Sequence, residues 1–283
     1  MMGVVAAVGY QSDWFDVVRA PFMVNAFVAG SLVAVAAGLI GYHVVVRRQV
    51  FAAHALAHIG FPGATGAVVL GLPVTAGLLV FCIAGALAIG ALGKAVSERE
   101  VATGTVLAFA TALGVLFGSL ASRSASTVTS ILFGNLLGVS GAQILTFACF
   151  TLVLGAVLAV VARPLVFASI DPQVAEARGV PVRALGVVFM VLLALVVTMS
   201  VQVIGTLLLF ALVVTPSAAA LYVTARPAAV VALGTAIALV SVWTGLLAAA
   251  MFDLPPSFAI VTIAVAVWLV LYAVSRARVR HGR

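Results

Sequence analysis

Residues 44–64 read VVVRRQVFAAHALAHIGFPGA, and this stretch joins two apolar runs through a pair of arginines. Arg47 and Arg48 are adjacent, and the run after them carries His54 and His58 at a spacing of four residues. Residues four apart in a helix lie on the same face. A segment that merely crossed a membrane would be apolar at both positions, because ionisable side chains inside lipid are costly. The stretch therefore indicates a membrane helix in which the two histidine side chains have a functional role.

The whole chain has the composition of a membrane protein. Of its 283 residues, 65% are hydrophobic and 7% are charged, with a mean hydropathy of +1.35. Soluble domains carry about 25% charged residues. The net charge is +7, but the basic residues stand singly or in pairs between apolar runs rather than along one face. This arrangement indicates membrane topology, and we expect no nucleic acid partner.

Apolar runs bounded by charged residues, proline or glycine predict about nine membrane helices, and eight to ten spans fit the pattern. The expected fold class is all-α: a polytopic integral membrane helical bundle that fills residues 1–283 as a single transmembrane domain. The predicted spans are 22–46, 52–71, 74–96, 101–120, 140–162, 183–200, 203–223, 228–250 and 255–275.

The basic residues set the expected orientation, because cytoplasmic loops are enriched in lysine and arginine. With nine spans and the N-terminus outside, twelve of the 14 Lys and Arg residues are cytoplasmic, and Arg19 and Arg123 are outside. We therefore expect a multi-pass protein of the cell membrane, surrounded by membrane lipid, with a cytoplasmic C-terminus. Residues 121–139 are too polar in their first half to span, and predict an interfacial or re-entrant segment on the outer side.

Residues 169–186, SIDPQVAEARGVPVRALG, predict a short capped helix near 171–179. Asp171 suits the N-cap and Pro172 the first helical position. Gly179 suits a left-handed C-terminal cap, and Pro181 prevents the helix from continuing. The helix is too short to cross a bilayer.

The charged residues of this helix, Asp171, Glu176 and Arg178, indicate that it lies in water, on the cytoplasmic side of the predicted topology. A short capped helix there is typical of a docking element for a soluble partner. The alternative is a capped loop between two spans, and the residues alone leave both interpretations open.

Three segments, in this order, resemble the permease subunit of the zinc/manganese-type ABC importers. Residues 44–64 resemble the paired basic residues, the acidic or His position, the His and the Pro-Gly of that family. IDPQVAEARGVPV, residues 170–182, is similar to its cytoplasmic coupling segment, and VIGTLLLFALVVTPSAAALYV, residues 203–223, to a late span broken by proline. The resemblance covers about residues 22–275 and departs at His54, where many members carry Asp.

The resemblance implies a transporter built from two copies of this permease, two ATP-binding cassette subunits and an extracytoplasmic metal-binding protein. It assigns coupling to the ATPase to Asp171, Pro172, Glu176, Arg178 and Gly179. The sequence contains no GxxxxGK[ST] phosphate loop, so ATP would be hydrolysed by a separate partner chain and this chain is not expected to be an enzyme. No permanently bound cofactor is expected.

His58 and His54 are the candidate metal ligands. Two imidazoles on one helix face suit contact with a single borderline metal ion. The transported metal is expected to be zinc, then manganese, because imidazole suits zinc whereas manganese favours oxygen ligands. The alternative is that each imidazole donates a hydrogen bond to a neighbouring helix. His43, beside the basic pair, is expected to be interfacial.

Two other functions are compatible with parts of the pattern. An ATPase-independent metal channel or secondary carrier would use the same histidines. The HxxxH spacing also occurs in membrane di-iron enzymes, but these need several further His boxes, and this chain has four histidines in total.

Overall fold

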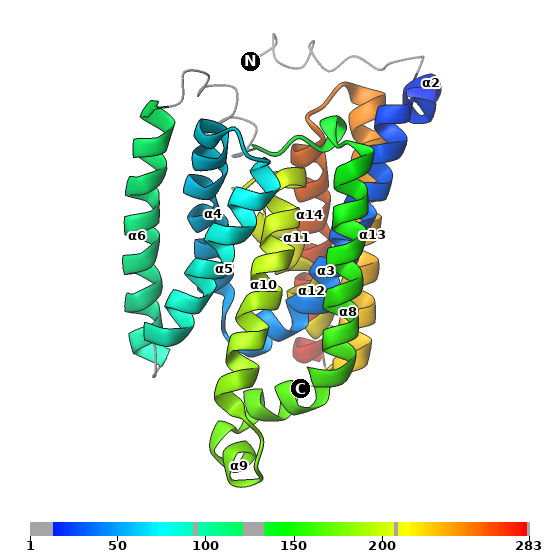
Figure 1. Cartoon of the computed structure of the whole chain (residues 1–283). Helices are drawn as coiled ribbons and strands as arrows, with labels where there is room; N and C mark the ends of the chain where they lie inside the picture. The colour runs from blue at the N-terminus through cyan, green and yellow to red at the C-terminus, as the bar shows by residue number, and fades with distance from the viewer. Residues whose placement is uncertain (1–13, 93–95, 121–132, 207–208, 282–283) are drawn as a thin grey trace. The chain divides into compact units, whose positions relative to one another are not determined.

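The computed structural model of the chain describes residues 14–92, 96–120, 133–206 and 209–281 (Figure 1). Every regular element within these ranges is a helix, which confirms the all-α class. The contacts within the chain divide it into two compact units, Met1–Tyr42 with Asn135–Ala148 and Ala211–Arg283, and His43–Gly134 with Cys149–Phe210. The second of these contains His54 and His58 and is called the histidine unit below; the first is called the α13–α14 unit.

The histidine unit is built on α4, which packs against α5, α6 and α10 (Figure 1). α10 also packs against α5, and α5 against α6. Its complete helices are α4 (Val50–Leu70), α5 (Val74–Leu92), α6 (Val96–Leu120), α9 (Pro172–Ala177) and α10 (Val182–Ile204).

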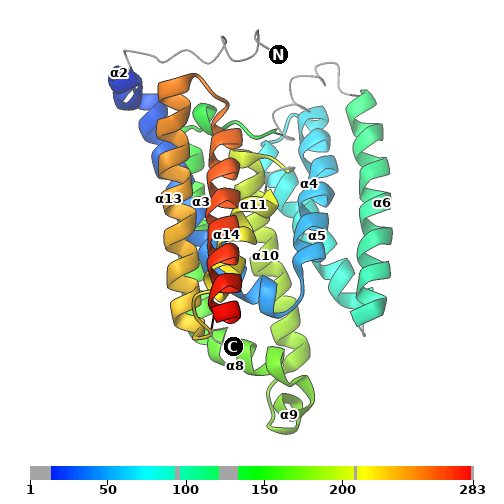
Figure 2. The same cartoon turned by 180° about the vertical axis from the view of Figure 1, so that it is seen from behind.

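In the α13–α14 unit, α13 and α14 lie side by side (Figure 2), and α12 packs against both. The indole Nε1 of Trp243 in α13 donates a hydrogen bond of 2.8 Å to Ser31 Oγ in α3. The complete elements of this unit are α2 (Trp14–Arg19), η1 (Leu136–Gly138), α12 (Thr215–Leu221), α13 (Pro227–Phe252) and α14 (Pro256–His281). The helices whose residues are divided between the two units are α3 (Pro21–Val46), α8 (Gly141–Ile170) and α11 (Leu209–Val213).

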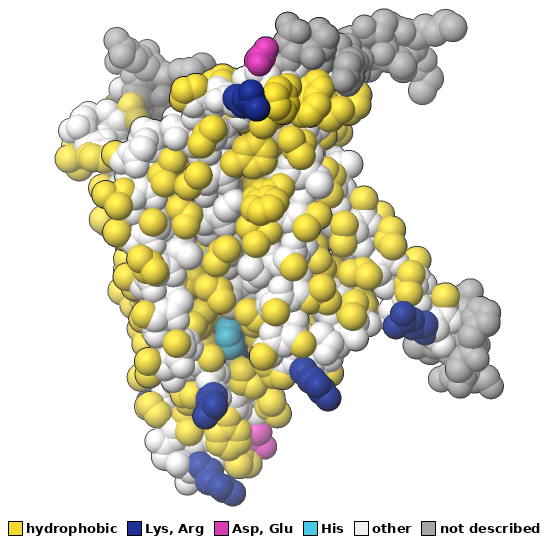
Figure 3. All heavy atoms as spheres, turned by 90° about the vertical axis from the view of Figure 1, so that its right-hand side faces the viewer, with side chains coloured by type: hydrophobic (Ala, Val, Ile, Leu, Met, Phe, Trp, Pro, Cys, Tyr) yellow, Lys and Arg dark blue, Asp and Glu magenta, His cyan; other side chains and the backbone are white. Residues whose placement is uncertain are grey.

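Eight of the described helices are long and apolar enough to cross a membrane: α3, α4, α5, α6, α8, α10, α13 and α14. On the face drawn in Figure 3, charged side chains lie at the top and in the lower part of the view, and the stretch between them has none and is largely hydrophobic. Lipid contact accounts for this pattern, because a bilayer excludes charge from its core. The chain is therefore a multi-pass helical membrane protein.

The predicted span 203–223 is not one long helix. This accounts for the difference between the nine predicted spans and the eight long apolar helices among the described residues. α10 ends where Gly205 takes a positive φ of 82°. Two short helices follow, α11 and α12, and Pro216, which lacks an N–H donor, lies in the first turn of α12. The described residues therefore agree with the lower limit of the predicted range.

α8 is longer than the sequence indicated, since it continues past the predicted end at 162 to Ile170. Pro164 lies inside this helix without ending it. Leu165 and Ala168 beyond it are buried, so packing holds the extra turns. α8 therefore runs up to Asp171 and leads directly into α9. Most of the segment 121–139, predicted to be interfacial or re-entrant, lies outside the described residues.

α4 and α5 approach each other closely at two glycines. A Cβ atom on Gly63 would overlap the carbonyl oxygen of Gly77, and one on Gly77 would overlap the carbonyl oxygen of Gly63. In lipid, helices associate by such close van der Waals contact between small residues. This contact fixes the position of α4 five residues after His58.

We predict that Gly63→Ala lowers the melting temperature of the purified protein, because the added methyl group forces α4 and α5 apart. Overpacked contacts cost about 1–3 kcal/mol. The control is Gly104→Ala in α6, where a Cβ would have no atom within 4 Å. Thermal unfolding in detergent measures both variants, and equal melting temperatures would contradict the close approach.

Candidate functional site

The two candidate metal ligands lie together on α4. The ring centroids of His54 and His58 are 4.8 Å apart, with the ring planes at 71°. Both side chains are half-buried. Within the described part of the chain, neither imidazole makes a hydrogen bond, so the alternative of a purely structural hydrogen bond to a neighbouring helix has no support there. Sequence spacing predicted this shared face correctly.

The helix that carries the pair is held firmly on its other faces. Ala55, Leu56 and Ala57 are fully buried between the histidines. The Sγ of Cys82 in α5 donates a hydrogen bond of 3.5 Å to the Leu56 carbonyl oxygen. Gly71 ends α4 in the left-handed conformation, with φ 69°. The histidines therefore project from a rigid element.

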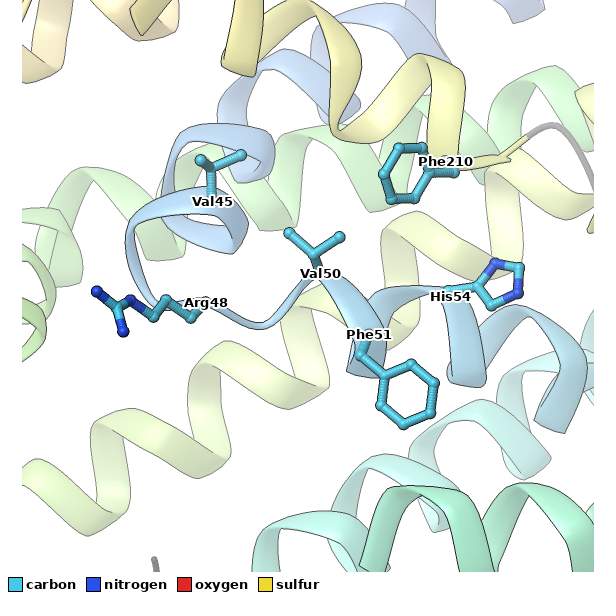
Figure 4. Close-up of a pocket in the computed structure, with 6 residues that line it drawn as sticks. All are labelled: Val45, Arg48, Val50, Phe51, His54 and Phe210. Atoms are coloured by element: carbon cyan, nitrogen blue, oxygen red, sulfur yellow. The ribbon is translucent and has the colours of Figure 1, made fainter. Parts of the chain in front are cut away.

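A pocket of about 630 Å³ is lined by His54 (Figure 4). Its walls are apolar apart from His54 and Arg48, and include Phe51 and Phe210. Arg48 has an unusual positive φ of 54° in the turn between α3 and α4. In Figure 4 its side chain points away from His54. This orientation reduces the repulsion that a nearby guanidinium would exert on a cation at the imidazole.

Two imidazoles do not complete a metal site. No group of three His, Cys, Asp or Glu side chains in the described residues could hold a metal ion. Backbone geometry provides one further oxygen near the pair. Pro62 lies inside α4 and has no N–H, so it cannot donate to the carbonyl oxygen of His58, four residues earlier. Pro62 thus removes the regular helical donor of that carbonyl group.

α9 has the caps that the sequence predicted. Asp171 is the N-cap, and its Oδ1 accepts a hydrogen bond of 3.0 Å from the Val174 N–H. Pro172 occupies the first turn. At the other end Gly179 has φ 79°, and its N–H donates to the Glu176 carbonyl oxygen at 3.0 Å.

The C-terminal cap of α9 is a Schellman motif, because the Val180 N–H also donates to the Ala175 carbonyl oxygen at 3.0 Å. Ala175 is fully buried, whereas Asp171, Glu176 and Arg178 are exposed. The helix therefore presents a charged surface from a rigid, double-capped frame.

Arg47 connects the segments on either side of α9 with the turn before α4. Its Nη1 donates a hydrogen bond of 3.0 Å to Ser169 Oγ, two residues before the N-cap Asp171. Its guanidinium also lies 5.1 Å from the ring centroid of Phe189 in α10. One side chain thus contacts both helices that flank α9.

Sequence reasoning missed this role of Arg47, because it interpreted the arginine pair as a topology signal and as a family motif. It also missed Phe210 as a pocket residue, because segment 203–223 was interpreted as a span broken by proline in which no single side chain stood out. His43 is buried within the chain, with 4% of its surface exposed, and its place at the membrane interface stays a prediction. No local pattern could have located these long-range contacts.

Eight helices apolar enough to cross a membrane, a histidine pair on one of them and a short capped helix between two of them are features of a membrane transport protein. Residues 19–275 match the model of the ABC 3 transport family, and the chain belongs to this family. The match covers most of the chain and confirms the resemblance found in its motifs.

Curated relatives of similar length include two named for manganese. The "Manganese transport system membrane protein MntC" of Listeria innocua is 29% identical over 252 residues, which cover 89% of this chain and 90% of the relative. The "Manganese import system permease protein ScaB" of Streptococcus parasanguinis is 26% identical over 200 residues, with 70% and 71% covered.

Two solved structures share the fold. "PsaBC from Streptococcus pneumoniae in complex with Fab" aligns with a TM-score of 0.82 and 25% identity, covering 92% of this chain and 95% of that chain. "An inward-facing conformation of a putative metal-chelate type ABC transporter" aligns with a TM-score of 0.68 and 17% identity, covering 89% and 85%. The second likeness concerns the fold alone.

Proposed function

We propose that the chain is the membrane permease of an ATP-driven importer of a divalent transition metal, with zinc preferred and manganese second. Two copies work with two separate ATP-binding cassette subunits and receive metal from an extracytoplasmic binding protein. Family membership and relatives named for manganese transport or import support the metal class. The chain itself carries no phosphate loop, which supports a separate ATPase.

The observation that carries this proposal is the contact between His54 and His58, with ring centroids 4.8 Å apart inside a membrane helix. Zinc binds imidazole nitrogen at about 2.0–2.1 Å. Two neighbouring imidazoles can therefore bind the same zinc ion. Zinc is placed before manganese because both side chains offer nitrogen, whereas manganese prefers oxygen. The His58 carbonyl oxygen, which Pro62 cannot bond, is a candidate third ligand.

An incomplete ligand set suits transport better than storage. A solute in transit has to bind strongly enough to enter and weakly enough to leave. Two imidazoles leave coordination positions open for water or for groups that accompany the metal. The pocket beside His54 supplies space for such a partly hydrated ion.

α9 is proposed as the coupling element for the ATPase. The proposed orientation, with the N-terminus outside and the C-terminus in the cytoplasm, requires nine crossings, so the short apolar helices α11 and α12 would together make the ninth. The caps of α9 hold it as a rigid body, and Glu176 and Arg178 are exposed for polar contact with a partner. The competing function is an ATPase-independent metal channel or secondary carrier. Uptake into proteoliposomes that requires both the ATPase subunit and ATP would exclude it.

We predict that His58→Ala lowers metal uptake by about tenfold or more, because a ligand is lost from the pathway. The assay measures uptake of zinc and of manganese, separately, in cells that depend on this permease. His281→Ala, at the last residue of α14, serves as the matched control. Normal uptake of both metals by well-expressed His58→Ala protein would remove His58 from the mechanism.

We predict that Gly179→Val uncouples ATP hydrolysis from uptake. A Cβ at this position would meet no atom within 4 Å, so the effect comes from the backbone alone. At φ 79° a residue with a Cβ pays roughly 1–2 kcal/mol. Asn tolerates this conformation better than Val, so Gly179→Asn is the matched control.

Three measurements test the coupling prediction: co-purification of the two subunits, ATPase rate and uptake. The expected result is weaker association or hydrolysis without uptake for Gly179→Val, and near-normal behaviour for Gly179→Asn. If the valine variant associates and transports normally, α9 is only a connecting loop.

A further inference from the structure

The histidine unit contains a second cavity, of about 370 Å³, beside the start of α10, the helix that follows α9. It lies between the turn that joins α3 to α4, the last turn of α5 and the first turns of α10. Of the described residues that line it, Arg47 and Arg183 are cationic, Gln49 is neutral and polar, and none is Asp or Glu. One part of the cavity wall is therefore positively charged.

The rest of the wall is apolar. It is formed by side chains such as Ile89 in α5 and Phe189 and Met190 in α10. A simple inorganic anion gains nothing from such a wall. A molecule with an anionic head and a hydrocarbon chain satisfies both parts.

Two glycines keep the cavity open without being needed for helix packing. A Cβ on Gly186 in α10 would have one neighbour within 4 Å, the Nη2 of Arg47 at 3.9 Å. A Cβ on Gly90 in α5 would have none. A side chain at position 186 would therefore enter the cavity beside the guanidinium.

The arginines suit a phosphate group. A guanidinium has five N–H donors, so Arg47 can keep its hydrogen bond to Ser169 and also contact an anion. Arg183 is exposed in the first turn of α10. Basic pockets between membrane helices on the cytoplasmic side bind anionic lipid head groups.

We infer that this cavity binds an anionic phospholipid. Its phosphate lies between Arg47 and Arg183, with Gln49 as a further donor, and the start of an acyl chain lies against Ile89, Phe189 and Met190. The lipid would occupy the junction that Arg47 makes between the α3–α4 turn and the end of α8.

The test is native mass spectrometry of the assembled transporter in detergent, titrated with phosphatidylglycerol or with phosphatidylcholine. The expected result is preferential binding of phosphatidylglycerol. Arg183→Gln should weaken that binding about fivefold, the effect of one basic residue near a membrane surface. Arg163→Gln removes an exposed charge from α8 outside the cavity lining and should leave the preference unchanged.

Gly186→Leu is the second variant, since it fills the cavity without changing any charge and should also weaken phosphatidylglycerol binding. Equal binding of the two lipids, or an unchanged preference in both Arg183→Gln and Gly186→Leu, would overturn the inference. Displacement of the lipid by millimolar inorganic phosphate would do so as well, because the cavity would then be a site for free phosphate. The assay measures no transport, so its outcome is independent of the proposed metal.

Discussion

Hydrocarbon offers no hydrogen-bonding partners, so polar groups inside a membrane must be satisfied by the chain itself or by a solute. Some hydroxyl groups in this protein follow that constraint: Thr198 donates to the Ala194 carbonyl oxygen and Ser241 to that of Ile237. Among the described residues, the buried hydroxyls of Ser200, Thr206 and Ser217 have no such partner. His54 and His58 are the ionisable case, because they contact each other and no described residue hydrogen-bonds to them. Because ionisable groups cost more in lipid than hydroxyls do, we propose that a transported solute is the partner of this pair.

Close packing of α4 against its neighbours explains how His54 and His58 are held in place. In lipid, close approach between small residues replaces the burial that drives soluble folds. α4 makes such contacts on both sides, with Gly63 against Gly77 of α5 and with Phe61 against Gly114 of α6. The turn before the same helix carries Arg47, which contacts both helices that flank α9. The histidine pair and α9 therefore belong to one compact unit.

Local chemistry made much of this structure predictable. Asp171 and Gly179 cap α9 through hydrogen bonds to residues only three positions away, so both caps could be predicted from the sequence. The shared face of His54 and His58 could be predicted in the same way. The contact of Arg47 with Ser169 joins residues 122 apart and leaves no local signal. In segment 203–223 the sequence indicated the break at proline, but the turn at Gly205, which changes the backbone direction, was missed because an apolar run with one glycine matches a span. Single glycines in apolar runs give no indication of which will take a positive φ.

The central claim is that the imidazoles of α4 contact the transported metal. X-ray absorption spectroscopy at the zinc K-edge, on the purified transporter loaded with zinc, observes the ligands directly. The account predicts imidazole scattering at about 2.0–2.1 Å, with the imidazole contribution reduced in His58→Ala protein. A spectrum of oxygen ligands without imidazole, unchanged in that variant, would contradict it.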